Sequence, residues 1–253
     1  MIGVVIPAHN ESERIGAALQ AVLEAAEHPA LNGELVRVVV ALDGCSDATE
    51  AVAAQYGVER LVLDARNVGI ARARGAELLI EAGARWLAFT DADTVVSPDW
   101  LVRQLAEEAD VVCGPVAVAD WSAHGADSQR MQAHFARTYV DADGHRHVHG
   151  ANLGVATQAY RRAGGFAPLA CSEDVALVEA LAATGARIAW SAGPRVITSA
   201  RTDARARGGF GDTLLAVAAA LVQLPSLALP APDNTDAQGV RLLTHGIGQA
   251  PSM

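Results

Sequence analysis

The chain has 253 residues, 51% of them hydrophobic, and a formal net charge of −10 at pH 7. Its length favours one large domain with ample apolar sequence for a core, and its acidic balance argues against non-specific nucleic-acid binding. All 19 basic residues are arginines, so a basic side chain that contacts phosphate must be an arginine.

The first 93 residues alternate between short apolar runs and amphipathic segments. Apolar spacing predicts strands over residues 2–6, 35–42, 58–63 and 85–90, and helices over residues 15–23, 48–56 and 69–82. Strands that alternate with helices in this way predict an α/β fold with a mostly parallel central sheet, covered by helices on both faces.

Two carboxylates follow the fourth predicted strand in Asp91-Ala92-Asp93. The end of a strand in an open α/β sheet is where such folds bind ligands. Carboxylate oxygens are the ligands that Mg²⁺ and Mn²⁺ prefer. Because Asp-x-Asp is also common in acidic surface loops, the motif alone does not decide between a metal site and a solvated loop.

Other polar residues follow the ends of the predicted strands in the same half of the chain: Asn10, Glu11, Asp43, Asp47 and Asn67. Asp and Asn favour turns and helix caps, which explains Asp47 well. That preference explains less well why so many turns beside an Asp-x-Asp are acidic. The pattern therefore favours a polar site at the edge of the sheet.

The second half of the chain is less regular. Residues 111–118 form an apolar strand with a Gly-Pro break, and residues 128–139 are predicted to be helical. The segment 141–149 holds a second Asp-x-Asp and alternating histidines, but Asp143-Gly144 is a strong turn signal. We expect an exposed turn and strand there rather than a metal site, with His147 or His149 as candidate phosphate contacts.

Ser172-Glu173-Asp174 precedes apolar positions with helical spacing, so a helix should begin here. Acids at this position cap the helix and compensate its dipole. A carboxylate at a helix N-terminus is also held in a fixed orientation. Capping and a catalytic role both remain open from the residues alone.

Towards the C-terminus, residues 214–229 are apolar but shorter than the roughly 20 residues that a membrane span needs. We expect a core helix there and a flexible tail over residues 230–253. No signal peptide is expected, because no basic segment precedes the first apolar run. Cys45, Cys113 and Cys171 lack metal or redox spacing, which suits a reducing cytoplasm.

Several segments together resemble the successive motifs of family 2 glycosyltransferases. In chain order they are Val5–Glu11, Leu42–Thr49, Asn67–Arg74, Asp91–Asp93, Gly150–Asn152, Gly164–Phe166 and Glu173–Asp174. The resemblance covers about residues 2–200. Two positions depart from the family pattern, since Leu42 replaces a frequent acid and Gly75 replaces the asparagine that follows Ala73-Arg74.

The resemblance implies the GT-A fold and transfer of a sugar from a nucleotide-diphosphate sugar, with UDP as the first choice, to an acceptor hydroxyl. It implies a single domain over residues 1–229, with a nucleotide-sugar half (1–118) and an acceptor half (119–229). The acceptor is a small molecule or a lipid-linked one, which keeps peripheral membrane contact open.

The resemblance also assigns roles to residues. Asp174 is the candidate general base of an inverting reaction, and Asp93 with Asp91 would hold Mn²⁺ or Mg²⁺. The candidate nucleotide-sugar contacts are Pro7, Ala8, Asn10, Glu11, Asp43, Arg74, Asp91, Ala92 and Asp93, with Arg74 at the phosphates. The acceptor or sugar region comprises Gly150, Ala151, Asn152 and Glu173.

Three alternatives remain. A retaining enzyme resembling glucosyl-3-phosphoglycerate synthase would share the donor half but need no acceptor base. A nucleotidyltransferase would usually carry a glycine-rich basic loop after the first strand, where this chain has Pro7–Glu11. A non-catalytic protein that binds sugar nucleotides would have no use for both Asp93 and Asp174.

Overall fold

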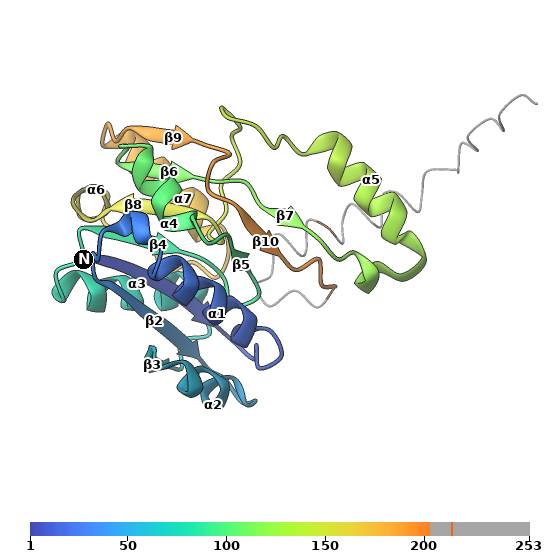
Figure 1. The fold of residues 1–253 in the computed structure, drawn as a ribbon, viewed down its shortest axis with the longest axis horizontal. Coiled ribbons are helices and arrows are strands. Elements are labelled where there is room, and N and C mark those ends of the chain that lie inside the picture. The colour runs from blue at the N-terminus through green and yellow to red at the C-terminus, as the bar shows by residue number, and fades with distance from the viewer. Residues whose placement is uncertain (203–213, 215–253) are drawn as a thin grey trace, which may run out of the picture.

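A computed structural model of the chain describes residues 1–202 and residue 214 (Figure 1). The predicted helix over 214–229, apart from Leu214, and the predicted tail over 230–253 lie outside the described residues. No helix in the described part of the chain is long and apolar enough to cross a bilayer.

Ten strands make up the two sheets of the described chain. They are β1 (Ile2–Ala8), β2 (Val36–Asp43), β3 (Glu59–Leu63), β4 (Trp86–Phe89), β5 (Val95–Val96), β6 (Val111–Cys113), β7 (Ala117–Val118), β8 (Leu153–Ala156), β9 (Ile188–Trp190) and β10 (Val196–Thr198). The larger sheet has the order β3-β2-β1-β4-β8-β6-β9, and the smaller one has the order β5-β10-β7.

The helices alternate with these strands along the chain. They are α1 (Ile15–Ala26), α2 (Thr49–Ala53), α3 (Val68–Glu81), α4 (Trp100–Ala106), α5 (Ser128–Thr138), α6 (Thr157–Arg162) and α7 (Glu173–Ala183). Short 3₁₀ turns add η1 (Pro29–Leu31), η2 (Ala54–Tyr56) and η3 (Ser122–Asp127). The predicted α/β fold with a mostly parallel central sheet is confirmed.

The direction of β8 decides which loops meet. Strand β1 pairs in parallel with β2 and β4, and β2 pairs in parallel with β3. Strand β8 runs antiparallel to both β4 and β6. The loop that enters β8 at residues 150–152 therefore reaches the same sheet edge as the C-terminal ends of β1, β2 and β4.

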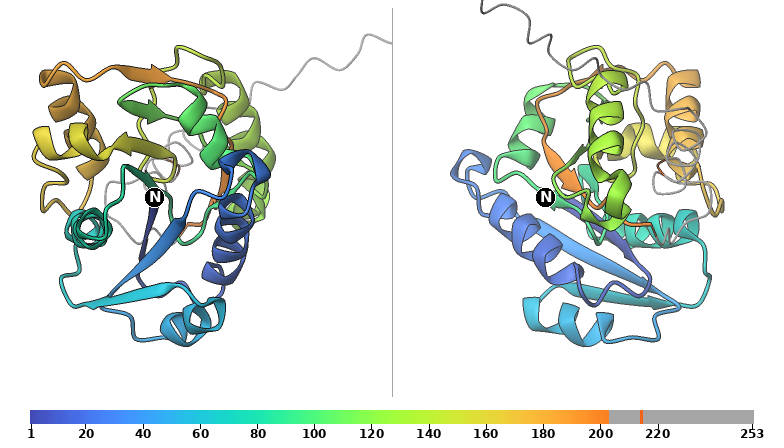
Figure 2. Two further views of the ribbon diagram at one scale, coloured as in Figure 1. Left: turned by 60° about the vertical axis from the view of Figure 1, so that its left-hand side comes forward. Right: turned by 90° about the vertical axis from the view of Figure 1, so that its right-hand side faces the viewer.

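Helices cover both faces of the large sheet, as Figure 2 shows. Alternate side chains of β1 point to opposite faces, since Ile6 packs with α1 and α4 while Val5 packs with α3, α6 and α7. A strand buried on both sides is continuously apolar, which is why the sequence pattern of β1 is so clear. The site edge lies beyond the strand ends, where α5 and the small sheet extend (Figure 1).

The apolar run over residues 111–118 is not one strand. It divides at Gly114-Pro115 into β6 of the large sheet and β7 of the small sheet. A Cβ atom at Gly114 would lie 2.1 Å from Nδ2 of Asn152, so glycine is needed where the chain passes this side chain. In the segment 141–149 the predicted turn is present at residues 143–144, but the predicted strand is wrong, since residues 145–149 have no regular structure.

Gly75 stands where the family pattern has asparagine, and the packing of α3 against β1 explains it. A Cβ atom at Gly75 would lie 2.6 Å from Cγ1 of Val5, which is fully buried. The missing side chain therefore lets the helix approach the central strand closely.

We predict that Gly75→Asn lowers the free energy of unfolding by about 1–3 kcal/mol, because it overpacks this contact. Glu77→Asn is the control, since the Glu77 side chain is 54% exposed on the same helix. Its effect should stay below about 1 kcal/mol. Urea denaturation measures both, and equal effects would contradict the packing explanation.

Candidate functional site

A cavity of about 860 Å³ opens at the sheet edge where β1, β2 and β4 end and β8 begins. It brings together most of the residues predicted from the sequence. The lining includes Pro7, Ala8, Glu11, Asp43, Asp91, Ala92, Asp93, Gly150, Ala151, Glu173 and Asp174. Asn10, Arg74 and Asn152 do not line it.

Asp43 ends β2 and organises one end of the cavity. Its carboxylate accepts hydrogen bonds from the backbone N–H groups of Ala65, Arg66 and Asn67 at 2.6, 2.8 and 2.7 Å. Asn67 in turn caps α3, because its Oδ1 accepts the N–H of Ile70 at 3.0 Å. Asp43 therefore fixes the loop that leads into α3 while it lines the cavity.

Asn10 and Asn152 do not line the cavity but form hydrogen bonds that fix the loops of its wall. Asn10 has a φ of 54°, and its Oδ1 accepts the N–H of Ser46 at 2.8 Å. Asn152 is 1% exposed, donates to the carbonyls of Pro115 and Pro194, and accepts the indole N–H of Trp100. Their positions indicate structural roles rather than the predicted direct contacts.

The arginine that belongs to the site is Arg72 and not Arg74. Arg74 is 60% exposed and forms an ion pair with Glu77 on the outer surface of α3. Arg72 is 3% exposed and lines the cavity. The buried face of α3 includes Gly69, Arg72 and Leu79, which have helical spacing. That periodicity is the signal in the sequence that could have identified Arg72 as the inward arginine.

Arg72 connects three segments of the cavity wall. Its guanidinium donates to Oδ1 of Asp91 at 2.5 Å, to Oε1 of Glu173 at 3.1 Å and to the carbonyl of Gly150 at 2.8 Å. Burial alone would lower the pKa of Arg72. The negative charges of Asp91 and Glu173 have the larger combined effect, so the pKa of Arg72 is raised. Burial raises the pKa of Glu173, and Arg72 works against that rise.

Asp174 lies beside this cluster in the first turn of α7, after Ser172 in the left-handed conformation (φ 56°). Its Oδ2 accepts the N–H of Gly150 at 2.7 Å, and its Oδ1 accepts the N–H of Val175 at 2.8 Å. Each carboxylate oxygen has a second lone pair. Asp174 is thus oriented by the backbone and still able to accept a proton in the cavity.

Asp93 lies at the other end of the Asp-x-Asp turn, in a crowded acidic environment. Arg201 contacts it, with Nη2 3.3 Å from Oδ2 of Asp93 and Nη1 2.6 Å from Oε1 of Glu11. Burial raises the pKa of Asp93 to about 6, Asp91 and Glu11 add to the rise, and Arg201 opposes it. A buried carboxylate with a raised pKa favours a nearby cation.

The donor groups of Asp91 and Asp93 fit the metal that the family implies. Within the described residues, no three side chains of His, Cys, Asp or Glu are arranged as a metal site. Mg²⁺, however, commonly takes only one or two carboxylates and completes its shell with substrate phosphates and water. Asp91 and Asp93 supply those hard oxygen ligands on the cavity wall.

The wall of the cavity formed by α5 and residues 139–149 contains a stack of aromatic rings. Tyr139 stacks on Phe135 with centroids 4.5 Å apart and on His147 with centroids 4.0 Å apart. The Tyr139 hydroxyl accepts the N–H of Val116 at 2.8 Å and lies 2.9 Å from Nε2 of His149. The hydroxyl and this nitrogen share a hydrogen bond. Burial lowers the pKa of His149 to about 4, which favours the neutral ring.

A protein-family model described as "Glycosyl transferase family 2" matches residues 3–163. The chain belongs to this family. The matched segment includes β1 to β8 and every carboxylate of the cavity wall except those of Glu173 and Asp174. The sequence resemblance to family 2 glycosyltransferases is therefore confirmed.

The family 2 chain matches only part of the length of a curated relative. The succinoglycan biosynthesis protein ExoO of Rhizobium meliloti is 33% identical over 138 residues, which are 51% of this chain and 35% of ExoO. The chain thus spans about a third of this curated relative.

Two solved structures share the fold at low identity. Residues 1–349 of TarS of S. aureus in complex with UDP-GlcNAc are 15% identical with a TM-score of 0.57, over 87% of this chain and 65% of that TarS fragment. The mannosyltransferase PcManGT of Pyrobaculum calidifontis, in complex with GDP-Man and Mn²⁺, is 16% identical with a TM-score of 0.56. That match covers 81% of this chain and 58% of PcManGT.

We predict that Arg72→Met lowers the free energy of unfolding by about 3–5 kcal/mol, because it leaves Glu173 buried without its cation. Arg74→Met is the matched control on the same helix, and its effect should lie within about 0.5 kcal/mol. Urea denaturation of the two variants measures both values. Similar losses in both variants would contradict the assignment of Arg72 as the arginine of the site.

Proposed function

We propose that this family 2 glycosyltransferase is an inverting enzyme that moves a sugar from a nucleotide-diphosphate sugar, with UDP as the first choice, to an acceptor hydroxyl. One observation carries the proposal. The carboxylate of Asp174 lines the same cavity as Asp91 and Asp93, and Arg72 with Gly150 connects it to Asp91. The proposed base and the proposed diphosphate site therefore line the same cavity.

The donor would occupy the half of the cavity built by β1, β2 and β4. Asp43 and the turn from Pro7 to Glu11 would border the nucleoside, since they line the cavity beside the loop into α3. Asp91 and Asp93 would hold Mn²⁺ or Mg²⁺ at the diphosphate. Such a cation, when bound, supplies positive charge that offsets the charge of the leaving diphosphate.

Asp174 would act on the acceptor. Its carboxylate would take the proton of the acceptor hydroxyl as that oxygen forms a bond to the anomeric carbon. The bond from that carbon to the β-phosphate oxygen would break, and the nucleoside diphosphate would leave with the electron pair. Attack opposite the leaving group inverts the anomeric configuration.

The wall on the acceptor side supports an uncharged acceptor. Met131, Phe135 and Tyr139 line it together with Val148 and the neutral His149. These side chains offer apolar surface and neutral hydrogen-bonding groups, which suit a sugar or the apolar part of a larger acceptor.

The similar structures do not decide between nucleotides, because TarS is solved with UDP-GlcNAc and PcManGT with GDP-Man.

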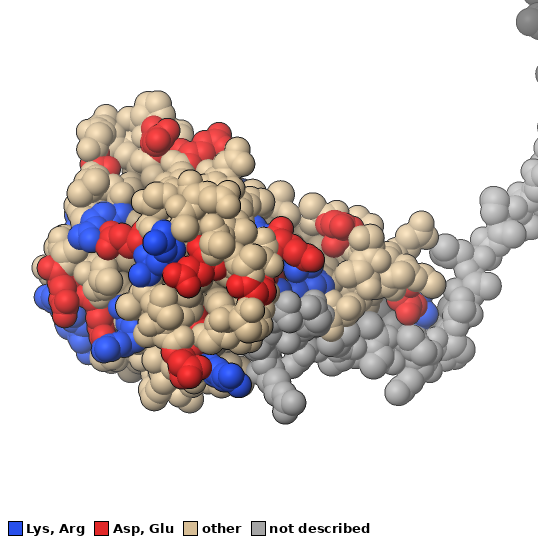
Figure 3. Space-filling view, turned by 90° about the horizontal axis from the view of Figure 1, so that it is seen from below, with Lys and Arg blue, Asp and Glu red and all other residues tan. Residues whose placement is uncertain are grey.

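The three cysteines are free thiols, which supports a reaction in the cytoplasm, with or without contact to a membrane surface. On the face shown in Figure 3, acidic and basic side chains are interspersed, and no basic block of the kind that binds nucleic acid is seen.

We predict that Asp174→Asn folds and binds UDP in the presence of Mn²⁺, yet loses sugar transfer by about two to four orders of magnitude, because the amide does not take up the proton. The measurements are melting temperature, UDP affinity by calorimetry and kcat. Near-normal kcat would refute Asp174 as the base.

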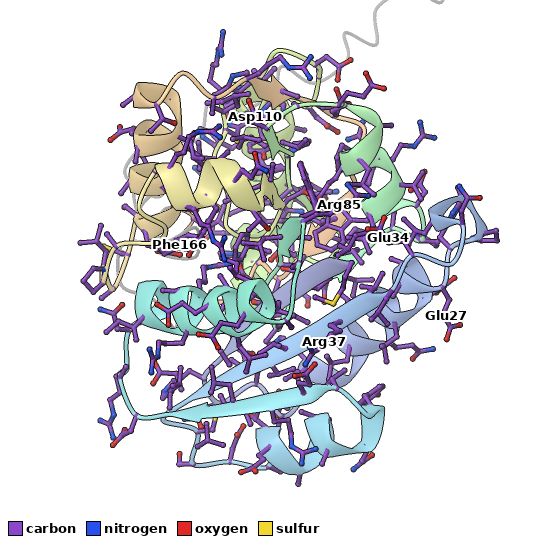
Figure 4. The ribbon with its side chains drawn as sticks, turned by 90° about the vertical axis from the view of Figure 1, so that its left-hand side faces the viewer. Glu27, Glu34, Arg37, Arg85, Asp110 and Phe166 are labelled. Atoms are coloured by element: carbon purple, nitrogen blue, oxygen red, sulfur yellow. The ribbon has the colours of Figure 1, made fainter. Side chains whose placement is uncertain are left out.

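Asp110→Asn is the matched control for this substitution. Asp110 precedes β6 at the opposite edge of the sheet, and its Oδ2 accepts the N–H of Arg187 at 2.9 Å. Figure 4 shows that edge, with Asp110 on the same side as Glu34 and Arg85. Asp110→Asn likewise replaces a carboxylate that accepts a backbone hydrogen bond, but it should leave sugar transfer unchanged. If only Asp174→Asn loses transfer, the loss is not a general effect of replacing such a carboxylate by an amide.

Asp93→Asn should remove the gain in UDP affinity that Mn²⁺ produces in the wild type, because a neutral amide replaces a hard anionic ligand. Calorimetric titration of UDP with and without Mn²⁺ measures that gain. Asp99→Asn is the control, since Asp99 pairs with Arg103 and does not line the cavity. An unchanged Mn²⁺ effect in Asp93→Asn would place the metal elsewhere.

A further inference from the structure

Arg201 contacts Asp93, one of the two carboxylates that would hold the metal, although nothing in the sequence motifs assigns it a role. It follows β10, and its guanidinium lies between Oε1 of Glu11 at 2.6 Å and Oδ2 of Asp93 at 3.3 Å. The three side chains are 12%, 4% and 10% exposed, respectively. A positive charge therefore already lies on one of the two proposed metal ligands.

The backbone near Arg201 is anchored. Ala200 is 2% exposed and packs in a small cluster with Trp121 and Met131. The Ser199 hydroxyl accepts the N–H of Arg201 at 3.2 Å, and Thr198 belongs to β10. The side chain of Arg201 thus extends into the cavity from an anchored backbone.

Among the described residues, three arginines line the cavity: Arg66, Arg72 and Arg201. Arg72 has its guanidinium engaged by two carboxylates and a carbonyl. Arg66 is 78% exposed beside Asp64 in the loop held by Asp43, and no ion pair joins it to Asp91 or Asp93 among the described residues. Arg201 is therefore the arginine placed to bind the diphosphate next to Asp93.

We propose that Arg201 neutralises Asp93 in the free enzyme and moves onto the donor diphosphate when a divalent cation binds Asp93. The inference rests on the proposed function, because the donor and the cation are those of the transfer reaction. A divalent cation repels the guanidinium from Asp93, and the diphosphate attracts it. Arginine can bind two phosphate oxygens at once, and the chain has no lysine for this task.

The exchange has two consequences of opposite sign. Without nucleotide, Arg201 and Mn²⁺ compete for Asp93, so Arg201 weakens metal binding. With nucleotide, Arg201 contacts the diphosphate, so it strengthens nucleotide binding. A residue that only supports the fold would weaken both kinds of binding when it is replaced.

The test uses Arg201→Gln in the full chain. Titration with Mn²⁺ alone, followed by calorimetry or by electron paramagnetic resonance of free Mn²⁺, should show affinity higher by about threefold or more. Titration with UDP at saturating Mn²⁺ should show affinity lower by about tenfold or more. Uridine, which lacks the diphosphate, should bind both proteins equally.

Two further variants keep the test decisive. Arg195→Gln is the matched control, because Arg195 precedes β10, pairs with Asp141 and does not line the cavity; it should leave all three affinities unchanged. Arg201→Lys retains the charge but not the bidentate geometry, so it should keep the wild-type affinity for Mn²⁺ and still weaken UDP binding, which tests the inference if Arg201→Gln does not fold.

The outcomes separate this inference from the proposed function. Unchanged or weaker Mn²⁺ binding in Arg201→Gln, or unchanged UDP binding, would overturn the exchange of partners while leaving the glycosyltransferase proposal intact. A wild-type protein that binds neither UDP nor GDP with Mn²⁺ would instead contradict the proposed function itself.

Discussion

The buried guanidinium of Arg72 is the interaction on which the rest of the site depends. A charge that is 3% exposed is stable only when its partners are close and well oriented. Those partners are Asp91 after β4, Glu173 in α7 and the carbonyl of Gly150 before β8. Segments far apart in the sequence are thus held to one helix, and Asp174 is placed next to them by the N–H of Gly150.

The topology makes this arrangement possible. Because β8 runs against its neighbours, the residues that enter it arrive at the edge where β1, β2 and β4 end. Asn152 then fixes the entering loop through Pro115, Pro194 and Trp100. Polar groups that are buried in this way require their partners, so the loop that orients Asp174 is itself a rigid part of the fold.

Much of the fold and half of the cavity were predictable from the sequence. Apolar runs and helical spacing located the first strands and helices, and the ordered motifs located Asp91, Asp93 and Asp174. The motif also led to Arg74, although helical periodicity points Arg72 inward. Arg201 could not be predicted, because its ion pair with Glu11 depends on the tertiary position of the chain after β10. The strand expected within residues 141–149 is absent, and the rings of His147 and His149 stack on Tyr139 after the end of α5.

Asp174, set in place by the Arg72 cluster, is proposed to activate an acceptor hydroxyl for a single displacement at the anomeric carbon. The configuration of the first-formed product measures this most directly. With a donor and acceptor identified by turnover, proton NMR at early times distinguishes the two anomers through their coupling constants. The account predicts inversion relative to the sugar nucleotide, and retention of configuration would contradict it.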